Sequence, residues 1–409
     1  MEKLEIENGK QETPTMAISA RIRAAMQNSS WIRRMFEEGA ELKARLGPDR
    51  VYDFTLGNPD LEPPPRLKEE LVKVAADLRP GLHSYMPNAG LLNTRQALAD
   101  MLCRHHGLEF KAQDLILTCG AAGGLNVVLK ALLDPGDEVL ILAPYFPEYL
   151  FYADNHGGIA RVVETDENFE IDLYRLGEAL SPRTRAVIIN SPNNPTGQMY
   201  DAATLKELGR FLAHHAGRHG RPVYLVADEP YRHIVYDGME VPSVFAAYPN
   251  TLLVTSFSKD LSIPGERLGY IAVSPKATGR GELEGAMVLA NRILGFVNAP
   301  ALMQRLVANL TEVTLDITPY ARRRDLLCDL LAGAGYKFLK PKGAFYLFPQ
   351  APGGDDLSFV AALKEENILA VPGRGFGRAG YFRLAFCVPE QVIQAAAPGF
   401  ARTKQKLVG

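Results

Sequence analysis

Hydrophobic and polar positions alternate along the middle of the chain in a way that predicts a sheet covered by helices. Short, mostly apolar runs of the length of a buried strand occur at Leu115–Thr118, Glu138–Leu142, Ala186–Ile189, Val223–Ala227, Leu252–Thr255 and Leu268–Val273. Between them lie stretches with apolar residues at helical spacing, at Leu91–His106, Leu125–Leu133 and Ala202–Ala216. Alternation of this kind is typical of an α/β domain with a mostly parallel sheet and helices on both faces.

The two flanks have a different pattern. Helical spacing over roughly Ser19–Leu46 predicts an N-terminal arm, which the proline-rich stretch Pro59–Pro65 separates from the main body. After Pro300 the pattern predicts one long helix through Leu331, then short strands at Ala344–Phe348 and Tyr381–Phe386 with a helix between them. We therefore expect three parts: the arm with part of a small domain in residues 1–62, a large ligand-binding domain in residues 63–300, and the rest of a small α+β domain in residues 301–409.

The composition narrows the class of partner. The 409 residues carry 45 Lys and Arg against 47 Asp and Glu, a formal net charge of −2, so no global positive charge attracts nucleic acid or an anionic membrane. No apolar run reaches the length of a membrane span. The four cysteines, Cys103, Cys119, Cys328 and Cys387, are far apart, and no histidine pair falls at metal-ligand spacing with a nearby carboxylate in a suitable loop. We expect a cytoplasmic protein that binds a small molecule and holds no metal.

The segments that follow the apolar runs carry the candidate chemistry, because ligands of α/β sheets bind beyond the carboxyl ends of the strands. These segments are Gly120-Ala121-Ala122-Gly123-Gly124, Pro144-Tyr145-Phe146, Asn190-Ser191-Pro192-Asn193-Asn194-Pro195-Thr196-Gly197, Asp228-Glu229-Pro230-Tyr231, Ser256-Phe257-Ser258-Lys259 and Gly265-Glu266-Arg267-Leu268-Gly269-Tyr270. The glycine-rich segment is either a tight turn or an anion site at a helix start. The spacing G-x-G-x-x-G of a dinucleotide site is absent.

Individual residues in these segments indicate a carbonyl cofactor that bears a phosphate. Lys259, if it lies in a cleft, can lose its proton and form a Schiff base, whereas most lysines are solvated surface charges. Arg267 offers a planar donor fork that suits a phosphate. Asp228 either caps the next turn or faces a pyridine nitrogen and keeps that nitrogen protonated. Tyr231 and Asn194 can hydrogen-bond a ring oxygen, and Phe146 can stack on a ring.

Taken together, the ordered segments N-x-P-N-N-P-T-G, D-E-P-Y, S-F-S-K and G-E-R-L-G-Y resemble a known family. They are similar to the class I/II aminotransferases that depend on pyridoxal phosphate, the fold-type-I group that includes the aspartate aminotransferases. The similarity extends from about Asp53 to Phe386. It implies a large domain with a mostly parallel seven-stranded sheet, a smaller α+β domain, and pyridoxal 5′-phosphate as the cofactor.

The resemblance also implies roles for the residues that match. Lys259 would form the Schiff base and later move a proton, Asp228 would pair with the pyridine nitrogen, and Tyr231 and Asn194 would hold the ring oxygen. Phe146 would stack on the ring. The residues around the phosphate would be Gly120, Ala121, Ala122, Ser256, Ser258 and Arg267. Ala122 departs from the family, which often has a polar residue at that position.

For the substrate, the resemblance implies that Arg383 and Asn194 bind the α-carboxylate and that the loop at Gly57 closes over it. Tyr85 matches a tyrosine that reaches the phosphate in the partner subunit, which implies a homodimer. Transamination needs two half-reactions through one pocket, with an amino acid as donor and a 2-oxo acid such as 2-oxoglutarate as acceptor. Arg292 is a hypothetical reader of the distal carboxylate of aspartate.

Three alternatives stay open at this point. An aliphatic or aromatic amino acid could be the donor, with Trp31 and Tyr145 in the lining of the pocket. The same cofactor site could catalyse β-elimination, as in a C–S lyase. A regulator that retains the fold without activity is the non-enzymatic alternative, although no helix-turn-helix pattern or basic patch precedes Asp53.

Overall fold

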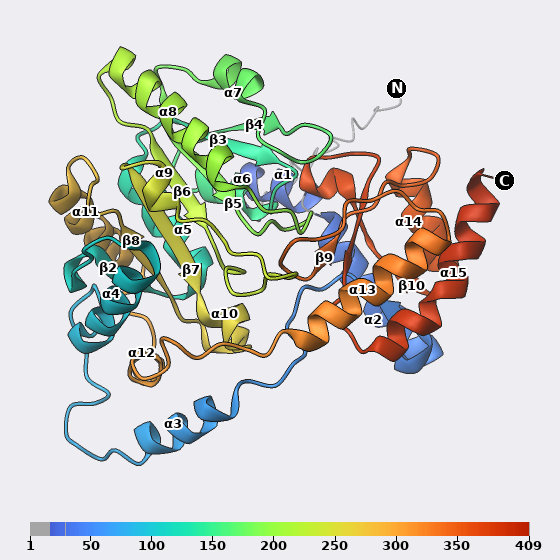
Figure 1. Cartoon of the computed structure of the whole chain (residues 1–409), viewed down its shortest axis with the longest axis horizontal. Coiled ribbons are helices and arrows are strands. Elements are labelled where there is room, and N and C mark those ends of the chain that lie inside the picture. Colours follow the sequence, from blue (N-terminus) through green and yellow to red (C-terminus); the bar gives the residue numbers. More distant parts are fainter. Residues whose placement is uncertain (1–16, 29, 409) are drawn as a thin grey trace, which may run out of the picture.

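A computed structural model, which describes residues 17–28 and 30–408, contains one large sheet and two small ones (Figure 1). The large sheet has seven strands in the order β2-β8-β7-β6-β5-β3-β4. All neighbouring strands are parallel except that β8 runs antiparallel to both β2 and β7. The predicted α/β fold with a mostly parallel seven-stranded sheet is confirmed.

Six of these strands coincide with the apolar runs, and one does not. The strands are β2 (Leu115–Thr118), β3 (Glu138–Ala143), β4 (Ile159–Glu164), β5 (Thr184–Asn190), β6 (Tyr224–Asp228), β7 (Thr251–Ser256) and β8 (Gly269–Val273). The sequence pattern did not predict β4. This strand lies at the edge of the sheet and is largely exposed, so it contains charged residues such as Arg161 where a central strand has apolar ones.

Both faces of the large sheet are buried by helices, which explains why its central strands are apolar throughout. Alternate residues of a strand point to opposite faces, so Leu140 and Ile141 of β3 belong to two different hydrophobic cores. One core includes residues of α4 (Leu92–His106), α8 (Ala202–His219), α9 (Val244–Ala247) and α12 (Ala301–Val307). The other includes residues of α5 (Gly120–Leu132), α6 (Glu148–Asp154) and α11 (Arg280–Ile293). The short helix α7 is Leu173–Ala179.

The C-terminal part forms a separate core, seen on the right of Figure 1 in orange and red. It comprises the helices α13 (Thr318–Gly333), α14 (Asp356–Glu365) and α15 (Glu390–Val408). Its strands are β9 (Tyr346–Leu347), β10 (Ile368–Leu369), β11 (Val371–Pro372) and β12 (Phe382–Ala385). The strand β1 (Tyr52–Asp53) pairs with β10, so the segment after the arm joins this part. The domain boundaries stay a prediction.

One helix expected to be continuous is divided, because the expected helix from Pro300 to Leu331 consists of α12 and α13. The arm contains the helices α1 (Ala20–Asn28) and α2 (Ser30–Leu46), and residue 29 is outside the described residues. β-Branched residues such as Thr311 and Val313 disfavour a helix in the segment between α12 and α13. Pro319 then starts a new helix, because proline fits only the first turn. Helix α3 (Pro65–Ala75) begins in the same way and projects from the body in Figure 1.

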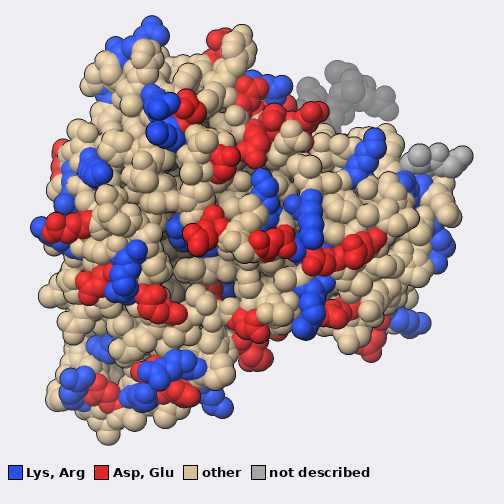
Figure 2. Space-filling view, viewed as in Figure 1, with Lys and Arg blue, Asp and Glu red and all other residues tan. Residues whose placement is uncertain are grey.

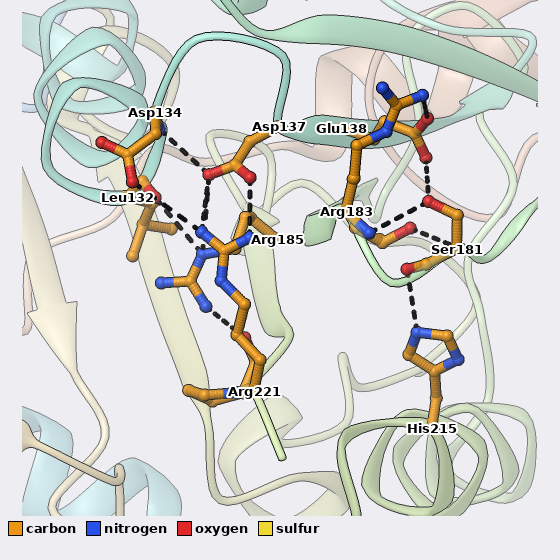
Figure 3. A network of polar contacts seen from close by, with 11 residues as sticks. Leu132, Asp134, Asp137, Glu138, Ser181, Arg183, Arg185, His215 and Arg221 are labelled. Atoms are coloured by element: carbon orange, nitrogen blue, oxygen red, sulfur yellow. Dashed lines mark hydrogen bonds and ion pairs between the residues drawn. The ribbon is translucent and has the colours of Figure 1, made fainter. Parts of the chain in front are cut away.

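Charged side chains cluster at the amino ends of the strands, opposite to the ends that carry the motifs (Figure 3). Arg221 donates two hydrogen bonds to Asp137, over 2.7 and 2.8 Å. Beside this pair, Glu138 is fully buried and accepts hydrogen bonds from Ser181 and Arg183. Burial alone would raise the pKa of Asp137, but the hydrogen bonds from Arg221 and from the backbone N–H of Asp134, with the charges of Arg221 and Arg185, together hold this pKa below its usual value.

On the face shown in Figure 2, acidic and basic side chains are interspersed, and neither sign forms a large continuous area. None of the helices in the described part of the chain is long and apolar enough to cross a membrane.

Candidate active site

A cavity of about 350 Å³ lies where the carboxyl ends of the central strands meet the C-terminal part of the chain. Twelve of the residues selected from the sequence line it: Gly57, Ala121, Ala122, Phe146, Asn194, Asp228, Tyr231, Ser256, Ser258, Lys259, Arg267 and Arg383. The topology explains this convergence, because parallel strands end at the same edge of a sheet. Residues from segments more than 300 positions apart thereby form one wall.

Lys259 lies on α10 (Phe257–Asp260), the single helical turn that follows β7. Its Nζ donates a hydrogen bond to the carbonyl oxygen of Gly57 over 2.8 Å. Burial lowers the pKa of Lys259 to about 8, and the nearby charges of Arg267 and Arg383 act in the same direction. A substantial fraction of this amine is therefore neutral near physiological pH, as a nucleophile requires.

Asp228 ends β6 and is buried with one oxygen unpartnered. Its Oδ2 accepts a hydrogen bond from the hydroxyl of Tyr149, whereas Oδ1 has no partner among the described residues. Burial raises the pKa of Asp228 to about 7; the bond from Tyr149 opposes the shift and the charge of Glu229 adds to it. A cationic N–H group that met Oδ1 would restore the ionised carboxylate.

Tyr231 lies near this acid, and Tyr346 contacts Tyr231. The hydroxyls of Tyr231 and Tyr346 are 3.0 Å apart, and both side chains are buried. Burial raises the pKa of Tyr231 well above its usual value, so its hydroxyl keeps its proton and can act as a donor. Tyr346 was not among the residues selected from the sequence.

Arg383, on β12, is buried and only partly paired. Its Nη1 donates to Oδ1 of Asn194 over 3.0 Å and its Nη2 donates to the carbonyl oxygen of Thr55, but Nε has no partner. The guanidinium carbon lies 4.8 Å from the ring centre of Tyr346 and 4.7 Å from that of Phe376. A planar cation held between two aromatic rings with a donor left over suits a carboxylate.

The other end of the cavity fits a phosphate. Helix α5 begins at Gly120, which has a positive φ of 71°, and the backbone there faces Arg267. A Cβ atom at Gly120 would lie 2.7 Å from Nη2 of Arg267, and one at Gly269 would lie 2.4 Å from the carbonyl oxygen of Thr255. The backbone contact at Gly269 leaves no room for a side chain, and the positive φ at Gly120 favours glycine there. Together with Ser256 and Ser258, the arginine and the helix start supply the donors that an anion needs.

Three predicted residues, Tyr85, Arg292 and Tyr145, do not line the cavity of a single chain. Tyr85 is 92% exposed in the loop between α3 and α4. Arg292 is exposed in the last turn of α11. Tyr145 is buried in the core between the sheet and α5 and does not line the cavity. The side chain of Trp31 is outside the described residues.

Several cavity residues were missed by the sequence analysis. They are Thr55, Leu56, Leu125, Glu148, Tyr149, Asn190, Pro230, Pro264 and Tyr346. Tyr149 follows Phe146 at helical spacing, a signal that could have placed both on one wall. Asn190 also could have been found, since it opens the asparagine-rich motif; its side chain donates to the carbonyl oxygen of Asp228. Among the described residues, no three His, Cys, Asp or Glu side chains are grouped as metal ligands would be.

Comparison with known proteins decides the family. Residues 49–399 match the family model described as aminotransferase class I and II. The chain belongs to this family. The aminotransferases of this family depend on pyridoxal phosphate, so the predicted enzyme class and cofactor are both confirmed. The donors and the orphaned Asp228 oxygen in the cavity fit that cofactor, with its ring nitrogen and its phosphate.

Relatives of this aminotransferase cover nearly its whole length. The aspartate/prephenate aminotransferase of Thermus thermophilus is 34% identical over an alignment of 367 residues that covers 88% of this chain and 92% of that protein. The aromatic-amino-acid aminotransferase 2 of Thermococcus litoralis is 31% identical and covers 93% of this chain and 96% of the relative. The two names differ in substrate at nearly equal identity.

Solved structures of aminotransferases have the same fold. A crystal structure of an aminotransferase from Eubacterium rectale has a TM-score of 0.93 and 40% identity, and covers 96% of this chain and all of that one (100%). An aspartate aminotransferase from Thermus thermophilus with maleate has a TM-score of 0.83 and 31% identity, with 94% and 99% covered.

Proposed function

We propose that this aminotransferase moves an amino group from an L-amino acid to a 2-oxo acid by two half-reactions through one pocket, as a homodimer in the cytoplasm. One observation carries the proposal. A lysine with a lowered pKa, a buried aspartate with a free oxygen and a buried arginine with a free Nε line the same cavity. The lysine amine suits a carbonyl group of a cofactor, the aspartate oxygen suits a protonated ring nitrogen, and the arginine suits the carboxylate of a substrate.

The roles of the residues follow from their chemistry. When bound, pyridoxal phosphate supplies an electron sink that weakens a bond at the α-carbon of the substrate. Lys259 holds the cofactor, and its neutral Nζ takes the proton from the α-carbon and returns it. Asp228 accepts the ring N–H at Oδ1, and Tyr231 and Asn194 donate to the ring oxygen.

The remaining residues bind and orient. Phe146 packs against the ring, and Ser256, Ser258, Arg267 and the backbone N–H groups of Gly120, Ala121 and Ala122 bind the phosphate. Arg383 and Asn194 bind the α-carboxylate of the substrate, and the loop at Gly57 covers it and excludes water.

A second copy of the chain would complete the site through Tyr85. In support, the loop and helix around this residue expose large apolar side chains: Val72 is 62%, Leu78 90% and Leu92 60% exposed. Light scattering should then give twice the chain mass, and Tyr85→Phe should weaken pyridoxal phosphate binding without changing that mass. For the cytoplasmic location, the support is that all four cysteines are unpaired thiols.

Donor and acceptor are the finer part of the proposal. Glutamate with 2-oxoglutarate is the expected common pair, and aspartate needs a cation for its distal carboxylate. Arg292 of a second copy is the candidate for that cation. Arg292→Ala would then lower kcat/KM for aspartate by far more than a few-fold, and a smaller change would exclude the role.

An absorbance measurement tests the reaction. The purified protein with pyridoxal phosphate should have a visible band that Lys259→Ala alters, and a single amino acid should convert this band to a shorter-wavelength one without any oxo acid. Adding a 2-oxo acid should restore the band. A protein that stays colourless contradicts enzymatic function. Release of pyruvate and ammonia from a cysteine conjugate, without an oxo acid, would indicate a lyase instead.

A further inference from the structure

Three buried polar atoms around the cavity have no hydrogen-bond partner among the described residues. They are Oδ1 of Asp228, Nε of Arg383 and Oε2 of Glu148. A buried polar atom without a partner is costly, and a ligand that supplies the partner removes the cost. The proposed function accounts for the first two atoms, through the ring nitrogen and the α-carboxylate. It leaves the third unexplained.

Glu148 lies in the first turn of α6, two residues after Phe146, and its side chain lines the cavity. It forms no ion pair with the described residues. Burial raises the pKa of Glu148, and the nearby charge of Arg383 opposes this shift. A substrate carboxylate bound to Arg383 offsets that charge, so the ionised form of Glu148 then depends on a hydrogen-bond donor for its stability.

The proposed function already assigns a ligand group to each cation of the cavity. Its cations are Lys259, Arg267 and Arg383, which the proposed function assigns to the cofactor, its phosphate and the α-carboxylate. A second substrate carboxylate in this chain's cavity would therefore meet the buried Oε2 of a half-buried acid and no remaining cation. A side chain that ends in an N–H group would meet an acceptor with no partner. A substrate carboxylate and a substrate side chain that ends in an N–H group differ in charge and in hydrogen-bond donors more than in size.

We propose that Glu148 determines specificity by accepting a hydrogen bond from the substrate side chain, and that the preferred donor is an amino acid whose side chain ends in an amide or amine. This inference rests on the proposed function and changes its finer part, because glutamine and asparagine replace glutamate and aspartate as the preferred donors. Sites built to hydrogen-bond one group reject an isostere that lacks the group by large factors, since a buried partner is left unpaired.

An unreactive isosteric pair provides the test. Glutarate and glutaramate differ only in that a carboxylate of one is a carboxamide in the other. Their dissociation constants are measured by titration calorimetry on the holoenzyme. The parent should bind glutaramate at least tenfold more tightly than glutarate. Glu148→Gln should reduce this ratio to threefold or less, because the glutamine side chain can donate its amide N–H to a carboxylate as well as accept a hydrogen bond from a carboxamide.

Controls separate specificity from folding and from the proposed function. Glu178→Gln removes an exposed carboxylate on α7 and should leave the ratio unchanged. The spectral half-reaction with glutamine and glutamate, each relative to alanine, should follow the same preference. The inference is overturned if the parent protein binds glutarate more tightly than glutaramate, or if the ratio is unchanged in Glu148→Gln. In either case Arg292 becomes the candidate for substrate specificity. Failure of every amino acid, alanine included, to convert the band contradicts the proposed function itself.

Discussion

At the scale of single residues, the cavity combines an acid and a base whose pKa values are moved toward each other by burial. The pKa of Asp228 is raised to about 7 and that of Lys259 is lowered to about 8. Shifts of this size in a cleft are typical of catalytic groups. They also make the protonation state of both residues sensitive to any neighbour that donates a hydrogen bond or carries a charge.

Tyr149 is such a neighbour, and Tyr149→Phe should shift the acid limb of the pH profile of kcat/KM upward. The hydroxyl donates to Oδ2 and stabilises the ionised Asp228, so its removal raises the pKa of this acid and delays ionisation to higher pH. The lost hydrogen bond to a charged group is worth about 1.5–3 kcal/mol, or roughly a 10- to 150-fold loss in kcat/KM.

Tyr152→Phe is the matched control for this variant. It removes a hydroxyl from the same helix, α6, that makes no hydrogen bond to Asp228. An acid limb that stays in place in Tyr149→Phe, or that moves equally in both variants, would show that the Tyr149 bond does not set the ionisation of Asp228.

The lowered pKa of Lys259 can be tested without cofactor or substrate. Cyanate carbamylates only neutral amines, so modification of Lys259 in the apoprotein should rise as the pH increases through about 8. Lys406, whose pKa is raised by its hydrogen bond to Glu365, should react only at higher pH. Mass spectrometry of the peptides measures both rates in one sample. Parallel pH curves for the two lysines would contradict the shift.

At the scale of elements, the phosphate end of the cavity depends on close backbone contacts between β7, β8 and the start of α5. Gly269→Ala should force these elements apart, because its Cβ would lie 2.4 Å from the carbonyl oxygen of Thr255 and 2.8 Å from the backbone of Gly120. Overpacking of this kind costs about 1–3 kcal/mol. Pyridoxal phosphate affinity should fall along with the temperature of unfolding.

Gly285→Ala in α11 is the opposite case. A Cβ there has no atom within 4 Å, and alanine favours a helix by roughly 0.5–1 kcal/mol over glycine. In calorimetry, the melting temperature of Gly285→Ala should equal or exceed that of the parent, and the melting temperature of Gly269→Ala should be lower than that of the parent. Equal melting temperatures and equal cofactor affinity in the two variants would mean that the contact at Gly269 is easily relieved.

The sequence predicted elements and site residues where local pattern and chemistry agreed. Lys259 and Asp228 follow strands that are buried on both faces, so apolar runs located them. The edge strand β4 was not predicted because it is largely exposed to water and therefore has no apolar run. Tyr149 and Tyr346 escaped for another reason. Their importance comes from bonds to residues 79 and 115 positions away, and no local pattern encodes such a contact.

At the scale of the whole molecule, function and stability occupy opposite ends of the sheet. The cavity lies at the carboxyl ends of the strands, whereas the bidentate pair of Asp137 and Arg221 lies at the amino ends (Figure 3). Asp137→Asn should therefore destabilise the protein by about 1–3 kcal/mol, as loss of a charge-assisted hydrogen bond does, without changing kcat/KM under native conditions. Urea unfolding and steady-state kinetics measure the two effects separately.

The pH dependence of this effect has a definite sign. The pKa of Asp137 is held below its usual value in the folded protein, so its pairing stabilises the fold above the unfolded pKa of 3.8, and this contribution is lost as the pH falls through the lower folded value. The parent and Asp137→Asn should thus converge in stability in strong acid. A constant difference down to pH 2 would assign the effect to something other than ionisation.

The wall shared by the two ends of the chain has a consequence for synthesis. Arg383 binds the carbonyl oxygen of Thr55, and these residues lie 328 positions apart. A ribosome that adds about 5–20 residues per second needs roughly 15–65 s to reach Arg383 after it has added Thr55. During that interval the large sheet can form while the substrate end of the pocket has no arginine. A nascent chain can therefore acquire the cofactor-binding half of the enzyme well before it can bind an amino acid.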